Sequence, residues 1–144
     1  MKSHSGADKS RAEGIEAIRI AHDRAAPYWA AALLVFCATG LLTINLDFGP
    51  LWKGYVLDAT GPAWSYILFR LRFTAWVDNA WTRFFTPTRT LVIFVLVSFG
   101  IEGLQYLDLY DSTFDPLDLV AYLSLMVPLY IVDRWLLQSR PIAI

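Results

Sequence analysis

The chain has very little cysteine and histidine, which excludes most metal and redox centres. Cys37 is its single cysteine, so the chain can form no internal disulfide and no cluster of thiolates for zinc. Its two histidines, His4 and His22, both precede the first long apolar run. A haem or a zinc ion bound by an imidazole inside a membrane is therefore not expected. The sequence predicts no cofactor and no bound metal.

An excess of basic residues is also lacking. The chain has 12 Lys and Arg against 13 Asp and Glu, and its formal net charge is −1. Domains that bind nucleic acid usually carry a basic excess, and the sequence contains no glycine-rich loop of the kind that holds phosphates. Nucleic acid is therefore not expected among the partners.

Apolar residues are abundant instead. They make up 56% of the 144 residues, and the mean hydropathy is +0.44. Several apolar stretches approach the length of about 20 residues that a helix needs to cross a bilayer. We therefore predict an all-α integral membrane protein, a single domain over residues 1–144 with the lipid bilayer as its surroundings. The predicted four-helix bundle has spans at about residues 27–46, 55–73, 90–107 and 116–137.

The second predicted span is the least regular of the four. Its surroundings are apolar on average, but they include Lys53, Asp58, Arg70 and Arg72. Long basic side chains near the end of a span can reach the headgroup layer while their stems stay in hydrocarbon. We therefore predict that Arg70 and Arg72 extend into the headgroups at one end, with Asp58 near the other end.

The basic residues indicate the orientation of the chain. With four spans, every Lys and Arg except Lys53 falls on the side of the N-terminus. Because cytoplasmic segments of membrane proteins carry the excess of Lys and Arg, both termini are predicted to be cytoplasmic. The acidic residues gather at the opposite ends of the spans: Asp47, Asp58, Asp108, Asp111, Asp115 and Asp118.

Two cytoplasmic segments are predicted to form short interfacial helices. In residues 1–26, Ser10 and Glu13 have the spacing of a capping box, and apolar residues then recur on one helical face. The second segment, at about residues 76–85, has an apolar stripe with polar residues opposite. Basic residues in both are predicted to mark topology and to attract anionic lipids, not to bind a specific partner.

Polar residues recur near the outer ends of the last two spans. Glu102 and Gln105 are three residues apart and share a helix face, and Asp118 and Tyr122, four apart, do the same on the next helix. A short connection makes these helices antiparallel neighbours, so the two faces can meet. The sequence predicts an outward-facing polar pocket of Glu102, Gln105, Asp118 and Tyr122, completed by Asp58.

Each of these residues also has a structural interpretation. Asp115 before Pro116 is typical of a helix N-cap, and Asp118 then lies in the first turn, where the helix dipole favours a carboxylate. Gly100 and Gly103 are predicted to permit close helix packing. A charged Glu102 inside a bilayer costs about 2 to 3 kcal/mol, so it is predicted to be neutral or to share a proton, hydrogen-bonded to Gln105, Tyr122 or Asp118. That hydrogen bond can serve a functional or a purely structural role.

The pattern Glu102-x-x-Gln105, a short outer loop and Phe114-Asp115-x-x-Asp118-x-x-Ala121-Tyr122 resembles the small multipass bacterial proteins grouped as VanZ-like. It is also similar to a related group of small inner-membrane proteins whose last span reads FD-x-x-D-x-x-AY. The chain departs from the VanZ pattern because it lacks an Arg between the Gln and the Asp and has Tyr122 in place of Asn. The resemblance implies a bundle of four or five spans in the bacterial inner membrane and no established reaction.

Three classes of function follow from these observations. The first is a VanZ-like protein of envelope physiology whose outer pocket binds a lipid headgroup, an amphiphile or a cation. The second is an accessory or assembly subunit of a larger membrane complex, respiratory or photosynthetic, whose aromatic residues cover partner helices or lipid. The third is an intramembrane enzyme that uses Glu102 and Asp118 as an acid and base pair. No arrangement of a nucleophile and a base is evident, so no catalytic residue is predicted.

Overall fold

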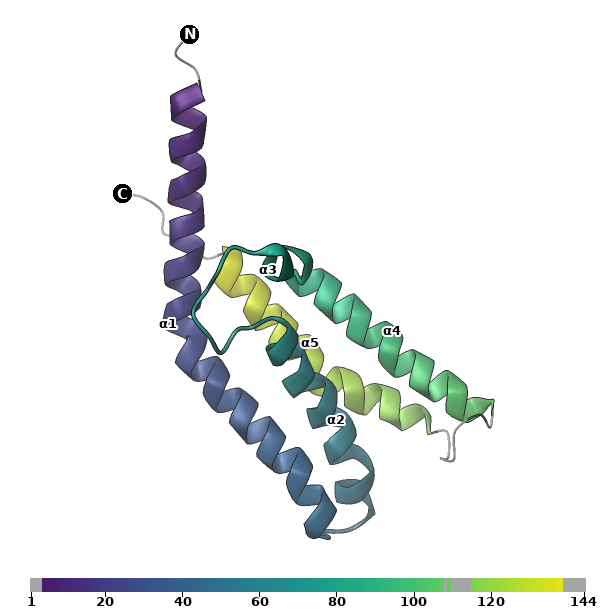
Figure 1. Ribbon diagram of the computed structural model, residues 1–144. Helices are drawn as coiled ribbons and strands as arrows, with labels where there is room; N and C mark the ends of the chain where they lie inside the picture. Colours follow the sequence, from purple (N-terminus) through teal and green to yellow (C-terminus); the bar gives the residue numbers. More distant parts are fainter. Residues whose placement is uncertain (1–3, 108, 110–114, 139–144) are drawn as a thin grey trace.

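The computed structural model describes residues 4–107, 109 and 115–138, and all secondary structure in this part is helical. Figure 1 shows the helices in chain order. Asp108, Asp111, Phe114, Lys2 and Arg140, on which some of the predictions above depend, lie outside the described residues. The helices are α1 (His4–Asn45), α2 (Pro50–Phe69), α3 (Ala80–Phe84), α4 (Pro87–Tyr106) and α5 (Pro116–Gln138).

Three of the helices are long and apolar enough to cross a membrane. They are the Lys9–Asn45 part of α1, all of α4 and all of α5. Large apolar side chains such as Leu34, Leu96 and Val120 are exposed along them, as expected for surfaces in contact with lipid. The chain is therefore a membrane protein. Helix α2 has a spanning length but is not among these three, because Lys53, Asp58 and its glycines make it less apolar.

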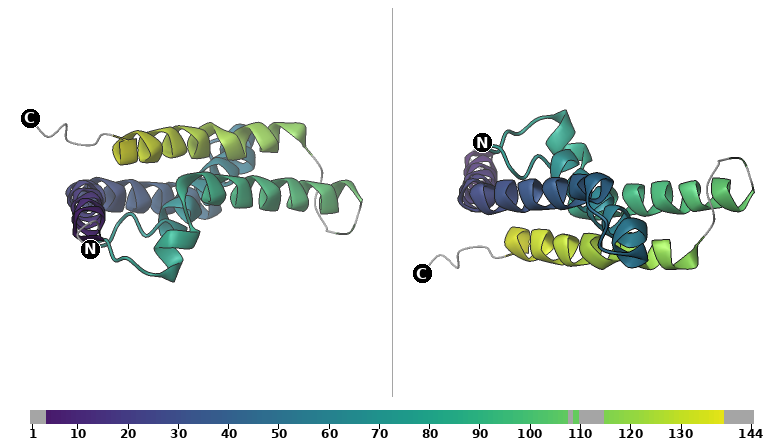
Figure 2. Two further views of the ribbon diagram at one scale, coloured as in Figure 1. Left: turned by 90° about the horizontal axis from the view of Figure 1, so that it is seen from above. Right: turned by 90° about the horizontal axis from the view of Figure 1, so that it is seen from below.

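Helix α2 lies at the centre of the packing. It packs against α1 on one side and α5 on the other, while α4 packs mainly against α5. In the right view of Figure 2, α2 lies close to both α1 and α5. Its residues Ala63, Tyr66 and Ile67 are completely buried, and Met126 of α5 is buried equally. The long helix that is not among the three candidate spans is thus the one with the fewest exposed residues.

One glycine permits the close approach of α1 and α2. A Cβ atom at Gly40 would lie 2.7 Å from the Thr60 hydroxyl oxygen, which is too close for any side chain. Gly100 and Gly103 on α4 behave differently, since an added Cβ would meet nothing within 4 Å. The prediction that these two glycines permit helix packing is therefore wrong within the chain, because they lie on an outer face of α4.

Helix α1 is longer than predicted. The expected interfacial helix and the expected span at residues 27–46 form one continuous helix, with Pro27 inside it. Ser10 and Glu13 lie within this helix, so the predicted capping box is wrong. Forty-two residues are about 63 Å long, roughly twice the hydrocarbon thickness of a bilayer. Figure 1 shows that the N-terminal part of α1 extends beyond the other helices and that α1 changes direction along its length, as internal proline favours.

The other helix ends follow local signals. Asn79 caps α3 in a capping box with Thr82, so this helix begins later than the predicted segment at residues 76–85. Thr86 caps α4 and Pro87 occupies its first turn. Helix α5 begins at Pro116, directly after Asp115, and continues through Pro128.

Candidate functional site

Buried polar residues form two clusters at opposite ends of the packed helices. The first, which we name the carboxylate cluster, contains the predicted pocket residues Asp58, Glu102, Gln105, Asp118 and Tyr122. The second, which we name the arginine cluster, was not predicted and contains His22, Tyr66, Arg70, Arg72 and Asp133.

Glu102 is the most deeply buried member of the carboxylate cluster. Its side chain is 2% exposed, although it lies in a helix whose neighbouring residues Ile101 and Leu104 are exposed. The Tyr122 hydroxyl donates a hydrogen bond of 2.9 Å to Glu102 Oε1. The predicted hydrogen bond between the third and fourth spans is therefore present, and it joins α4 to α5.

Asp58 and Asp118 extend the carboxylate cluster to α2. Both are half-buried, and their carboxyl groups share a hydrogen bond, with Glu102 within electrostatic range of each. Two carboxyl groups can share a hydrogen bond only when one of them carries a proton. Among the described residues, no Lys, Arg or His forms an ion pair with any of the three carboxyl groups. The cluster is therefore acidic and has no cation of its own.

Two buried oxygen atoms in the carboxylate cluster have no hydrogen-bond donor in the part of the chain that the structure describes. These are Glu102 Oε2 and Gln105 Oε1. Leaving such an acceptor unsatisfied in a protein interior costs about 1 to 3 kcal/mol, so most buried acceptors have a partner. The cluster is thus built to accept hydrogen bonds that the described residues do not supply.

Asp115 has the structural role that its position before Pro116 predicts. Its Oδ1 accepts a hydrogen bond of 2.9 Å from the backbone N–H of Leu117, as an N-cap residue does. Its Oδ2 accepts one of 2.7 Å from the hydroxyl of Tyr55 on α2. The Leu117 N–H and then the Tyr55 hydroxyl lower the pKa of Asp115 below its ordinary value. Asp115 thereby ties the beginning of α5 to α2, a contact that the sequence pattern did not indicate.

The arginine cluster contradicts the prediction for Arg70 and Arg72. These side chains do not extend into a headgroup layer: Arg70 is 8% and Arg72 is 2% exposed. Both pair with Asp133 of α5, which is completely buried. Arg70 Nε lies 2.7 Å from Asp133 Oδ2, and Arg72 Nε lies 3.4 Å from Asp133 Oδ1. The Tyr66 hydroxyl donates a further hydrogen bond of 2.9 Å to Asp133 Oδ2.

A helix cap turns both arginines inward. Helix α2 ends at Phe69, and Leu71 adopts a left-handed backbone conformation with φ 48°. The N–H of Leu71 donates to the carbonyl of Leu68, and the N–H of Arg72 donates to that of Ile67. These are the two hydrogen bonds of a Schellman motif, which here has leucine at the position that usually holds glycine. The resulting reversal brings Arg70 and Arg72 to the same carboxylate.

His22 connects the arginine cluster to α1. Arg72 Nη1 lies 2.8 Å from His22 Nδ1, and His22 Nε2 lies 2.8 Å from the carbonyl oxygen of Thr74. Arginine can only donate and a carbonyl can only accept, so Nδ1 accepts and Nε2 carries the hydrogen. His22 is therefore the neutral tautomer. The Arg72 guanidinium also lies over the Trp29 ring, 5.5 Å from its centroid.

Sequence reasoning missed Asp133 and His22, although one signal was present. Asp133 is an acidic residue near the C-terminal end of the fourth predicted span, which is the same predicted depth as Arg70 and Arg72 at the end of the second span. Opposite charges at equal depth in a membrane protein are candidates for a pair. The signal for His22 is weaker, because the interfacial segment that contains it was predicted to lie apart from the spans.

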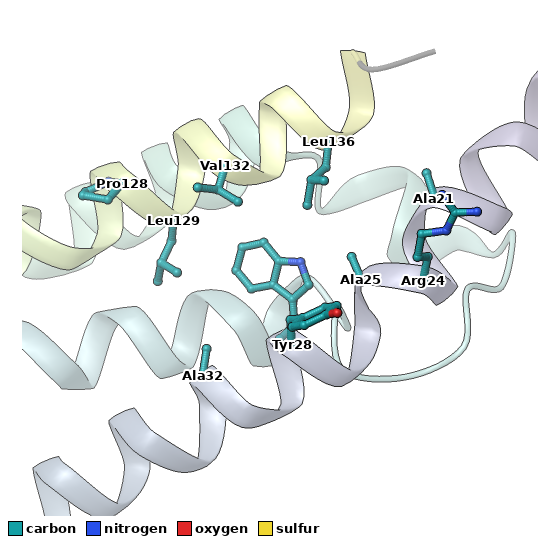
Figure 3. Close-up of a pocket in the computed structure, with 10 residues that line it drawn as sticks. Ala21, Arg24, Ala25, Tyr28, Ala32, Pro128, Leu129, Val132 and Leu136 are labelled. Atoms are coloured by element: carbon teal, nitrogen blue, oxygen red, sulfur yellow. The ribbon is translucent and has the colours of Figure 1, made fainter. Parts of the chain in front are cut away.

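A cavity of about 580 Å³ lies between α1 and α5. Figure 3 shows Leu129, Val132 and Leu136 of α5 facing α1 across it, where the small residues Ala25 and Ala32 leave the space open. Its lining is apolar except near Arg24 and Tyr28 of α1. The shape and the apolar lining of this cavity are suited to a hydrocarbon chain, and its described lining holds no pair of groups arranged for catalysis.

Comparison with protein-family models, with curated proteins and with solved structures found no match to this chain. Its function is therefore argued from the two polar clusters. Within the described residues, no three His, Cys, Asp or Glu side chains are placed to hold one metal ion together. The oxygens of the carboxylate cluster are arranged to accept hydrogen bonds from a donor, and the arginine cluster joins α1, α2 and α5.

Proposed function

We propose that the chain is a small VanZ-like multipass protein of the bacterial inner membrane. In this four-helix bundle, α2 crosses the membrane in addition to α1, α4 and α5. Two observations support this topology. The central position of α2 shields Asp58 and Thr60 from lipid, which supports a crossing by a helix that is not among the three candidate spans. The connection between α1 and α2 also lies at the opposite end of the helices from α3, as antiparallel crossings require (Figure 1).

Labelling of single cysteines tests this orientation. Cys37 is first replaced by alanine, and one cysteine is then introduced at Phe48, between α1 and α2, or at Asn79, before α3. In intact cells, a maleimide that cannot cross membranes is expected to label position 48 and to label position 79 only after the cells are opened. Labelling of position 79 from outside would contradict the cytoplasmic termini, and labelling of both positions from outside would contradict the crossing by α2.

The function that the geometry supports best is binding of a primary ammonium group by the carboxylate cluster. The observation that carries this proposal is the pair of buried, unpartnered acceptors, Glu102 Oε2 and Gln105 Oε1. They lie in an acidic cluster with no cation of its own, so a positively charged donor satisfies both the hydrogen bonds and the charge. An ammonium on a lipid headgroup or an amphiphile reaches the cluster from the outer surface of the membrane.

Hydrogen-bonding capacity distinguishes this ligand from other cations. A primary ammonium offers three N–H donors, whereas a quaternary ammonium offers none. Because no donor of the described residues reaches Glu102 Oε2 or Gln105 Oε1, a quaternary ammonium leaves both acceptors unsatisfied even when its charge is attracted. We therefore expect the protein to prefer the primary ammonium over the quaternary one when both carry the same alkyl chain.

Binding of decylammonium and decyltrimethylammonium to the protein in a neutral detergent tests the proposal. Isothermal titration is expected to show tighter binding of decylammonium, and Glu102→Gln is expected to weaken it by roughly 10-fold or more, since a hydrogen bond to a charged group contributes about 1.5 to 3 kcal/mol. Asp47→Asn is the control, because Asp47 is an exposed carboxylate paired with Lys53. Equal binding of both amphiphiles, or equal effects of the two substitutions, would refute the proposal.

The alternative is an accessory subunit of a larger membrane complex. The observation that favours it is the outer face of α4, where a Cβ added at Gly100 or Gly103 would meet nothing within 4 Å among the described residues and where Leu96 and Phe99 are exposed. Small residues flanked by large apolar ones allow a helix of another protein to approach closely. Purification in a mild detergent separates the two functions: a subunit migrates with a large complex at fixed stoichiometry, whereas a binding protein migrates as a small particle with lipid.

A further inference from the structure

A second cavity lies beside the arginine cluster. Its volume is about 170 Å³, which is large compared with the roughly 30 Å³ that one water molecule occupies in the liquid. It lies where α1, the end of α2, the beginning of α4 and the end of α5 come together. The residues that matter for its chemistry are His22, Arg70, Arg72, Thr86 and Leu137.

The arginine cluster carries more positive than negative charge. Arg70 and Arg72 are both cations, Asp133 supplies one negative charge, and His22 is neutral because its Nδ1 accepts from Arg72. The nearby Asp23 pairs with neither Arg70 nor Arg72: it accepts from the N–H of Trp76 and lies 3.9 Å from Arg19, which itself pairs with Glu16. Within the described residues, the two buried guanidinium groups therefore share a single buried carboxylate, and a buried cation without its own counterion is costly.

Hydrogen-bond donors also remain available. Among the described residues, the buried Arg72 Nε has no hydrogen-bond partner, since Asp133 Oδ1 at 3.4 Å contributes an ion pair without hydrogen-bond geometry. The N-terminus of α4 adds to this, because Thr86 and Pro87 line the cavity and α4 is 20 residues long. The positive end of a helix dipole favours an anion.

We propose that this cavity binds a phosphate group. Two guanidinium groups, an unpartnered N–H and a helix N-terminus match the charge and the acceptor oxygens of phosphate, for which arginine has a suitable planar geometry. The phosphate belongs either to an anionic lipid of the inner leaflet or to inorganic phosphate, because both present the same oxygens. Binding neutralises the excess charge of the arginine cluster and joins α1, α2, α4 and α5.

Thermal unfolding of the full chain in a neutral detergent tests this site. Sodium phosphate is compared with sodium chloride at equal ionic strength, and phosphatidylglycerol is compared with diacylglycerol, which lacks the phosphate. A rise of Tm with phosphatidylglycerol alone identifies the lipid, and a rise with sodium phosphate identifies the free anion as a ligand. The absence of a rise with either phosphate source refutes the site.

Two variants show whether a rise comes from this cavity. Leu137→Trp fills the space without changing any charge and is expected to abolish the rise in Tm. Arg72→Lys keeps the charge but loses Nε and the planar fork, and it is expected to reduce the rise even if Leu137→Trp does not fold. Arg24→Lys is the matched control on a surface arginine outside this cavity. An undiminished rise in Leu137→Trp or in Arg72→Lys would overturn the proposal.

Discussion

Replacement of Asp133 by asparagine is expected to destabilise the protein by about 3 to 5 kcal/mol, the usual cost of removing one partner from a buried ion pair. Asp133 is the carboxylate that faces both Arg70 and Arg72, and all three side chains are buried. The amide keeps the size of the side chain but loses its charge, so two cations remain without a counterion. The Tyr66 hydroxyl also loses its charged acceptor.

The loss of stability in Asp133→Asn is measured by unfolding the protein in detergent with increasing denaturant while its helix content is followed by circular dichroism. The control is Asp78→Asn, which breaks an exposed ion pair with Arg83 and is expected to change stability very little. Arg83 lowers the pKa of Asp78 below its ordinary value, so this control carboxylate is ionised at neutral pH. A similar loss in both variants would show that Asp133 is not a buried counterion.

A triple variant separates lost charge balance from lost packing. Arg70→Met, Arg72→Met and Asp133→Leu together leave no uncompensated charge in the cluster. Replacing a whole buried ionic group with apolar residues is often neutral or stabilising. The triple variant is therefore expected to be more stable than Asp133→Asn alone, and a still lower stability would contradict the electrostatic explanation.

Gly40→Ala is expected to destabilise the contact between α1 and α2 by about 1 to 3 kcal/mol, the typical cost of overpacking. The new Cβ would lie 2.7 Å from the Thr60 hydroxyl oxygen and 3.4 Å from Leu57. Thr60 cannot yield easily, because it is buried and its hydroxyl donates to the carbonyl of Val56. The two helices must therefore separate.

Gly103→Ala is the matched control for Gly40→Ala. It makes the same change in a helix, at a position where the new methyl group meets nothing within 4 Å. Alanine is the better helix former, so this variant is expected to gain about 0.5 to 1 kcal/mol. Thr60→Ala in the Gly40→Ala background removes the clashing oxygen and is expected to recover stability. If Gly40→Ala behaved like Gly103→Ala, the close approach of α1 and α2 would be refuted.

The last two long helices were predictable from the sequence. Their apolar runs are continuous, and each begins at a proline preceded by a capping residue, Thr86 before Pro87 and Asp115 before Pro116. The predicted ranges, 90–107 and 116–137, therefore agree closely with Pro87–Tyr106 and Pro116–Gln138. The contact of Glu102 with Tyr122 was predictable for a related reason, because a buried carboxyl group between neighbouring helices needs a partner.

The arginine cluster was not predictable in the same way. Arg70 and Asp133 are 63 residues apart, and helical periodicity carries no information about which distant residue a side chain meets. The inward turn of both arginines also depends on Leu71 in a left-handed conformation, which leucine rarely adopts. The continuity of α1 was not predicted, because a proline is typical of the first turn of a helix. A membrane helix nevertheless tolerates an internal proline, and Pro27 lies inside α1.

The separation of Asp133 from its two arginines has a consequence for biosynthesis. The ribosome releases Arg70 and Arg72 long before it reaches Asp133, so the translocon receives two guanidinium groups whose counterion does not yet exist. Stable packing of this region must therefore wait until Asp133 has been synthesised, and a message truncated before codon 133 should yield a product that quality-control proteases remove.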